Sequence, residues 1–315
     1  MFSIEKKTFG TFEIHSIKNV ETGEYVEVIP GYGANLHKLV LSKGGKCRSI
    51  LKSADTYEAF VSGAASHEGC KLAPWAGRVN NGKYAFEGKS YALSINDPNG
   101  HHAMHGLVYN KPFALIAESY TAESGRLEYS YQLNEAEGYP FSFLITISFE
   151  LNHQGLSCVT RVNNTGSTSL PYCDGWHPYF LIDCPVEEAF LTIPSKKTIV
   201  HDDLMVPTGE FEERPEFYEG TNIGDQRIDD CFCVENTGDR VVTSLHDPVN
   251  HYSIELWQDS GERKYNFVVV YVPDSRDCVA LEPLSGLPDT FNNQVGLIIL
   301  KEKEEITLSM GINIK

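Results

Sequence analysis

Residues 141–151 read FSFLITISFEL, and the order of apolar and polar side chains in this segment indicates its conformation. Apolar side chains recur at every second position, at Phe141, Phe143, Ile145, Ile147, Phe149 and Leu151. Ser142, Thr146, Ser148 and Glu150 are among the residues between them. Successive side chains of a β-strand point to opposite faces, so this alternation predicts a strand that buries one face and leaves the other polar.

Other segments repeat the pattern. Residues 126–133 and 305–314 also alternate, whereas 265–272 is a continuous apolar run that predicts a strand buried on both faces. Asn- and Gly-rich turns separate such runs, for example at 80–83 and 163–167. Many strands joined by turns predict an all-β protein, a large antiparallel β-sandwich with long loops.

The length is compatible with one large domain. The chain has 315 residues without an internal repeat or a clear linker, so we expect a single domain over 1–315. Residues 57–67 can form one short helix, and 184–228, rich in Glu, Asp, Pro and Lys, is the expected insertion.

Composition excludes several classes of protein. A formal net charge of −17 argues against a nucleic-acid partner and against docking on an anionic membrane. The first ten residues contain no signal-peptide core, and no run approaches the ~20 apolar residues of a membrane span. Eight scattered cysteines are expected to be reduced. We therefore expect a cytoplasmic protein, monomeric or homodimeric.

Two ionisable side chains stand in apolar surroundings. His177 lies in the segment CDGWHPYF, followed by Pro178 and Tyr179, and it is either a core histidine bonded to a backbone carbonyl or a proton donor held over a ligand ring. Glu282 ends the apolar run 279–281 and is followed by a proline. Partial desolvation would raise its pKa and make it a better base near neutral pH. The alternative is an exposed glutamate that starts a turn.

Three histidines occur together in HHAMHGL, residues 101–107. Their spacing resembles zinc motifs, but those usually lie on helices and this segment follows a turn, so we expect no metal. His101 and His102 are expected on a surface loop. His105, which precedes Gly106, is the best placed of the three to point inward.

Other polar residues can bind hydroxyl groups. Arg78 precedes a hairpin-like turn and can donate two hydrogen bonds to a carboxylate, a phosphate or a sugar; Asp229 and Asp230 can accept hydrogen bonds. Surface ion pairs and a solvated acidic turn are the alternatives. The sequence lacks dinucleotide, P-loop, serine-hydrolase and zincin motifs. Histidines, carboxylates, an arginine and aromatic rings on a β scaffold suit a neutral polyhydroxylated ligand.

Several segments, in their order along the chain, resemble the aldose 1-epimerase (galactose mutarotase) family. They are GRVNNGKYAFEGKSYAL, HHAMHGLVYNKPF, WHPYF, VPTGEF, IDDCF and LEPLSGLPDTFNN. The resemblance implies a β-sandwich of the galactose-mutarotase type without metal or cofactor. It implies that His177 is the catalytic acid, that Glu282 is the base and that His105 is a second active-site histidine. It also implies that Arg78 and Asp229 bind the sugar and that Tyr179 lies in the pocket. Gly77 and Trp176 stand where many members have asparagine, which leaves the sugar preference open.

The implied reaction interconverts α and β anomers of a free monosaccharide such as glucose or galactose. Glu282 would take the proton of the C1 hydroxyl while His177 protonates the ring oxygen, and nearby carboxylates such as Glu282 or Asp229 are expected to raise the pKa of His177. A catalytically silent sugar-binding or regulatory protein on the same scaffold is one alternative. An epimerase for a hexose 6-phosphate is another, but it needs a basic cluster that this acidic chain does not display near Arg78.

Overall fold

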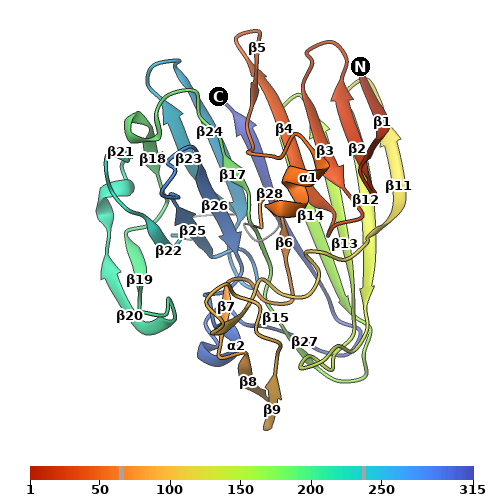
Figure 1. Cartoon of the computed structure of the whole chain (residues 1–315), viewed down its shortest axis with the longest axis vertical. Coiled ribbons are helices and arrows are strands. Elements are labelled where there is room, and N and C mark those ends of the chain that lie inside the picture. The colour runs from red at the N-terminus through yellow and green to blue at the C-terminus, as the bar shows by residue number, and fades with distance from the viewer. Residues whose placement is uncertain (64–66, 236–238) are drawn as a thin grey trace.

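The computed structural model describes residues 1–63, 67–235 and 239–315, and antiparallel strands make up most of them (Figure 1). One layer is a nine-stranded sheet whose members, in spatial order, are β11 (Ala114–Tyr120), β12 (Ser124–Leu133), β13 (Phe143–Asn152), β14 (Gly155–Asn164), β28 (Glu305–Ile314), β24 (Tyr252–Asp259), β23 (Arg240–Asp247), β18 (Phe190–Thr192) and β21 (Thr221–Asn222). The apolar side chains of β13 are buried at every second position. The strands predicted from alternation are therefore confirmed.

A second sheet carries the residues of the expected site. Its path runs through β20 (Pro207–Glu213), β19 (Lys197–His201), β22 (Asp229–Cys233), β25 (Phe267–Tyr271), β26 (Val279–Leu284), β16 (Gly175–Trp176) and β6 (Lys71–Leu72). An eighth strand, β17 (Tyr179–Phe180), pairs with β26 beside this path. Segments from three distant parts of the sequence, near residues 71, 176 and 282, thus become neighbours.

The N-terminal residues form a five-stranded meander in the order β1 (Phe2–Phe9), β2 (Phe12–Asn19), β3 (Tyr25–Ile29), β4 (Asn35–Lys43) and β5 (Lys46–Ser49). Both β2 and β4 contact the nine-stranded sheet, and Trp176 of the eight-stranded sheet meets Phe149 of the same layer. The five- and eight-stranded sheets therefore cover the nine-stranded sheet together, and a bridge between Leu51 and Phe180 joins them. This arrangement is the predicted β-sandwich.

The remaining elements are short. Three strand pairs join β7 (Arg78–Asn80) to β10 (His102–Met104), β8 (Lys83–Phe86) to β9 (Lys89–Ala92), and β15 (Leu170–Tyr172) to β27 (Ile298–Leu300). The helices among the described residues are α1 (Tyr57–Ser62), α2 (Thr290–Asn293) and the 3₁₀ turns η2 (Val186–Glu188) and η3 (Pro215–Phe217). Of the helix expected over 57–67, Tyr57–Ser62 form α1, which ends before its C-cap Gly63, and 64–66 lie outside the described residues. None of these helices is long and apolar enough to cross a membrane.

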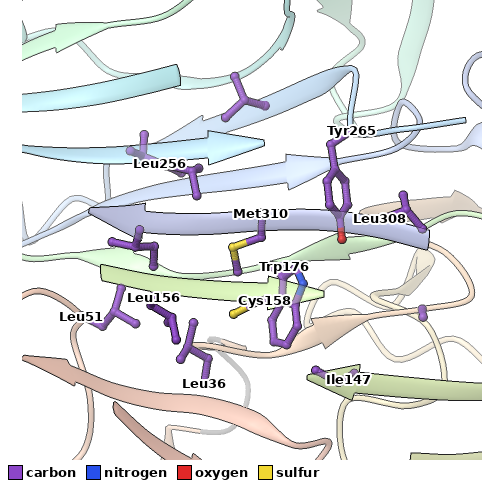
Figure 2. Packing of buried hydrophobic residues seen from close by; sticks show 14 of the residues in the cluster. Leu36, Leu51, Ile147, Leu156, Cys158, Trp176, Leu256, Tyr265, Leu308 and Met310 are labelled. Atoms are coloured by element: carbon purple, nitrogen blue, oxygen red, sulfur yellow. The ribbon is translucent and has the colours of Figure 1, made fainter. Parts of the chain in front are cut away.

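Large buried side chains fill the space between the layers (Figure 2). Trp176 and Tyr265 are fully buried there, beside Cys158 and Met310 of the nine-stranded sheet. One prediction is corrected on this side of the fold. The strand within 265–272 was expected to be buried on both faces, but Val269 and Tyr271 of β25 are only half-buried. Both residues line a cavity. That face of β25 is therefore open to a pocket and is not covered by a second apolar layer.

Candidate active site

His177 and Glu282 come from neighbouring strands and meet in space. The Nε2 atom of His177 lies 3.3 Å from Oε1 of Glu282, and both side chains are less than one-tenth exposed. Glu282 lies on β26, and His177 stands between β16 and β17, which both pair with β26. Two groups 105 positions apart in the chain (282 minus 177) therefore share one site.

Backbone hydrogen bonds fix the position of His177. Its amide donates to the carbonyl of Cys70 at 3.0 Å, and its carbonyl accepts from the amide of Gly69 at 2.9 Å. The next residue, Pro178, accepts from the amide of Leu281 at 3.2 Å. The backbone on both sides of the imidazole is thus held by the segment just before β6 and by β26, so the ring has a defined direction toward Glu282.

His105 reaches the site through an unusual backbone turn. Both His105 and Gly106 have positive φ, at 62° and 79°, and the His105 amide donates to Gly77 at 2.9 Å. A Cβ at Gly106 would lie 2.0 Å from the carbonyl oxygen of Ala73, so only glycine fits there. This turn directs His105 inward, where its ring lies 5.3 Å from that of His177. The inward orientation expected for His105 is what the structure has.

Aromatic rings continue on both sides of these two histidines. Tyr179 stacks on His177 with centroids 4.9 Å apart and planes 15° apart, and His67 lies 4.5 Å from His105. Tyr271 packs edge-on against Tyr179 at 6.4 Å. Sequence reasoning found Tyr179 but missed His67 and Tyr271. Strand alternation gives a signal for Tyr271, because it shares a face of β25 with Val269; no motif distinguishes His67.

Arg78 and Asp229 provide the charged rim. Arg78, the first residue of β7, and Asp229, the first of β22, both line the cavity. Asp230 points elsewhere, since Nη1 of Arg214 donates to its carboxylate at 3.1 Å. Of the two neighbouring aspartates, Asp229 is therefore the one available to a ligand.

These side chains surround one hollow of about 340 Å³. This volume suits a small ligand. Its lining is His67, Gly77, Arg78, Met104, His105, His177, Tyr179, Asp229, Val269, Tyr271, Glu282, Leu284 and Pro288. All six residues that the sequence analysis selected lie in it. A more open hollow of about 600 Å³ around Phe211 and Phe267 is lined mainly by apolar and amide side chains, so volume alone does not locate the acid–base chemistry.

Burial shifts the ionisation of the site toward uncharged forms. It lowers the pKa of His177 to about 3, with a further contribution from His67, and it lowers the pKa of His105 well below its usual range. Burial raises the pKa of Glu282 well above its usual range; Asp229 adds to this shift and Arg78 opposes it. The expectation that carboxylates raise the pKa of His177 is therefore wrong, because loss of hydration on burial dominates and His67 adds to the downward shift.

The three histidines of the 101–107 segment separate in the structure. Nε2 of His102 lies 3.1 Å from the carbonyl oxygen of Leu204, His101 is exposed, and His105 faces the cavity. The expectation that His102 lies on the surface is wrong, since it is buried in β10. No cluster of three His, Cys, Asp or Glu side chains suited to a metal ion occurs within the described ranges.

A β-sandwich with a histidine–glutamate pair, a charged rim and aromatic walls defines a class of proteins that bind small polar molecules and can transfer protons to them. Comparison with known proteins gives the family. Residues 18–313 match the model of the aldose 1-epimerase family, so the chain belongs to that family of isomerases.

Individual relatives and one solved structure are similar to this chain over most of its length. The chain is 30% identical over 301 residues to YihR of Escherichia coli K12, described as uncharacterized, covering 93% of this chain and 92% of that protein. It is 21% identical to the maltose epimerase of Levilactobacillus brevis, covering 87% and 85%. A crystal structure of a galactose mutarotase-like protein from Clostridium acetobutylicum superimposes with a TM-score of 0.88 at 19% identity, covering 100% and 98%. This last similarity shows the fold.

Proposed function

We propose that this protein interconverts the α and β anomers of a free hexose, with Glu282 as the base and His177 as the acid. The observation that carries the proposal is the 3.3 Å separation of Nε2 of His177 and Oε1 of Glu282 at the wall of a small polar cavity. Anomer exchange needs one group to deprotonate the C1 hydroxyl and another to protonate the ring oxygen. Those two oxygens share one carbon, so adjacent acid and base groups can reach both.

The uncharged pair contains one transferable proton. Moving that proton from Glu282 to His177 produces a carboxylate and an imidazolium, and a bound sugar favours this form where its hydroxyls replace missing hydration. The carboxylate then takes the proton of the C1 hydroxyl while the imidazolium protonates the ring oxygen. The C1–ring oxygen bond breaks and the aldehyde forms. After rotation at C1, closure on the other face reverses both transfers, so no proton is consumed.

The neighbouring residues have separate tasks in this proposal. Arg78 and Asp229 bind the hydroxyls away from C1, and Tyr179 holds the His177 ring by stacking. His105, whose pKa burial lowers, remains neutral and can donate or accept one hydrogen bond. Its Nδ1 atom has no hydrogen-bond partner among the described residues, which suits a contact to the sugar or to water.

A free sugar fits the cavity better than a hexose phosphate. Apart from its histidines, the lining among the described residues contains one cationic side chain, Arg78, together with the carboxyl groups of Asp229 and Glu282. Among these residues, a phosphate dianion would meet two carboxyl groups and one guanidinium. The charge balance therefore favours an uncharged substrate.

Anomer exchange measured by one-dimensional NMR tests the proposal. Freshly dissolved α-glucose, α-galactose, maltose and glucose 6-phosphate are followed with and without protein. We expect faster equilibration of at least one neutral sugar and less for glucose 6-phosphate. A rate identical to the uncatalysed one for every sugar would favour the silent sugar-binding protein. Preference for the phosphate ester would contradict the assignment of an uncharged substrate.

A further inference from the structure

A second acid–base pair lies beneath the proposed active site. Nζ of Lys71 forms an ion pair with Oδ1 of Asp174, and both side chains are 0% exposed. The pairing of Trp176 with Lys71, together with strand alternation, places Lys71, Asp174 and Trp176 on the core face of the sheet. His177 therefore faces the opposite side, toward the cavity. The buried ion pair and the proposed catalytic pair thus lie on the two faces of neighbouring strands of the eight-stranded sheet.

Hydrogen bonds surround the buried carboxylate. The hydroxyl of Tyr265 donates to Oδ1 of Asp174 at 2.5 Å, and the hydroxyl of Tyr172 donates to Oδ2 at 2.5 Å. Nζ of Lys71 lies 4.6 Å from the ring centre of Trp176, which itself lies in the core near Tyr265 (Figure 2). The two charges are therefore fixed by several partners, so Asp174 has little freedom to move.

Stability alone does not account for an ion pair at this place. Removing two charges from water is costly, and apolar residues of similar volume often stabilise a core equally well or better. The surrounding cluster is otherwise hydrophobic and aromatic. Because the pair contributes little net stability but has a fixed geometry, we infer that its role is to hold the surrounding backbone in position.

Backbone contacts join the ion pair to both proposed catalytic groups. Lys71 follows Cys70, whose carbonyl accepts the amide hydrogen of His177 at 3.0 Å. The amide of Asp174 donates to Oγ of Ser285 at 2.9 Å, and its carbonyl accepts from the amide of Ser285 at 2.8 Å. Ser285 comes three residues after Glu282. The ion pair therefore connects the segment that holds His177 to the segment that holds Glu282, on the core face of the sheet.

We propose that Lys71 and Asp174 are positioning residues that set the distance between His177 and Glu282. This inference rests on the proposed acid–base function of that pair. A displacement of about 1 Å in a catalytic group can cost ~10²-fold in rate. Loss of the ion pair should thus reduce turnover even where the protein remains folded and still binds sugar.

The main test replaces the ion pair by apolar residues of similar volume, Lys71→Met with Asp174→Leu. The double variant leaves no unpaired charge, so we expect it to fold, with some loss of stability because the hydroxyls of Tyr172 and Tyr265 lose their acceptor. We expect kcat to fall by ~10–100-fold, with KM changing by less than about threefold. The control is Arg161→Met with Glu128→Leu, a partly exposed ion pair on the nine-stranded sheet in which Glu128 also accepts from Arg126. Neither residue lines the cavity, so this variant should keep the wild-type kcat.

A second readout does not depend on turnover. NMR signals of the His177 ring, observed in histidine-labelled protein without sugar, should shift in the double variant and stay in place in the control. If wild-type protein exchanges no sugar anomers, the proposed function fails, but these signals still decide the positioning. A folded double variant with wild-type kcat and unchanged His177 signals would overturn the inference.

A milder variant keeps the inference testable if the double variant does not fold. Ser285→Ala removes only the hydroxyl that accepts from the Asp174 amide. We expect a fall in kcat of ~5–10-fold and a smaller shift of the His177 signals. In that case, an unchanged kcat together with unchanged signals would count against the positioning role.

Discussion

The two buried acid–base pairs of the eight-stranded sheet both join a carboxyl group to a basic side chain, but they differ in their hydrogen bonding. Asp174 accepts hydrogen bonds from Lys71, Tyr172 and Tyr265. Glu282 contacts His177, and the Nδ1 atom of His177 finds no hydrogen-bond partner in the part of the chain that the structure describes. One pair is therefore saturated and enclosed, whereas the other has unused hydrogen-bonding capacity at a cavity.

This difference separates a structural pair from a reactive one. A carboxylate whose oxygens already accept several hydrogen bonds is stabilised in its charged form and exchanges protons poorly. A poorly hydrated pair beside a cavity can instead be stabilised by hydrogen bonds from a polar ligand. Burial is nearly the same for both pairs. Hydrogen-bond satisfaction and access to the cavity, more than burial itself, thus distinguish the two faces of the sheet.

The largest expected effect is on the cavity side. Glu282→Gln removes the base and keeps the shape of the side chain, so kcat should fall by ~10²–10⁴-fold. Binding of the sugar, measured by calorimetry, should change by less than about tenfold, because the lost contact acts mainly in the transition state. Wild-type exchange rates in this variant would remove Glu282 from the mechanism.

On the core side, the largest effect should be on stability. Asp174→Leu alone leaves Lys71 in the core without its counter-ion, where it must either stay charged or release its proton, so the free energy of unfolding should fall by ~3–5 kcal/mol. Adding Lys71→Met should recover most of that loss. Urea titrations of the two variants measure the difference. Equal stability of the single and double variants would show that the buried charges are not coupled.

The pH dependence of stability should reflect the raised pKa of Glu282 on the cavity side. Burial raises the pKa of Glu282, so above its ordinary pKa the unfolded chain loses this proton while the folded protein keeps it. The wild type should therefore lose stability relative to Glu282→Gln as pH rises above about 4.5, by at most ~1.4 kcal/mol per unit. Unfolding measured at pH 5, 6 and 7 for both proteins provides the comparison. A constant difference over this range would contradict the raised pKa.

The smallest expected effect concerns the rim of the cavity. Asp229→Asn should raise KM by ~3–10-fold with little change in kcat, since it weakens hydrogen bonds to hydroxyls away from C1. Asp230→Asn is the matched control, because Arg214 holds Asp230 outside the cavity. Steady-state kinetics on the preferred sugar compares the two. Equal effects of both substitutions would mean that Asp229 does not contact the sugar.

Much of the fold and of the site follows from the sequence. Alternation in 141–151 and 305–314 gives the strands β13 and β28, and desolvation of Glu282 follows from the apolar run before it. The resemblance to the family's motifs identifies six of the residues that line the cavity. These features depend on local patterns of side chains, which one sequence displays directly.

Other features depend on how distant segments meet. The low pKa of His177 could not be predicted, because it reflects the loss of hydration in a packed site together with the neighbouring His67, which is distant in the sequence. The exposed face of β25 depends on what covers it, and an apolar run carries no information about that. Lys71 and Asp174 are 103 positions apart in the sequence. The residues next to each of them in the sequence do not indicate that the two side chains pair.

A double-mutant cycle on anomer exchange tests most directly whether His177 and Glu282 act on one sugar as a unit. Exchange is measured by NMR for His177→Asn, Glu282→Gln and the double variant, after calorimetry confirms that each binds the sugar. Groups that act in one concerted proton transfer should give strongly non-additive losses, so the double variant should be little slower than the slower single variant. Losses that multiply, or a single variant with the wild-type rate, would contradict the shared role of the pair.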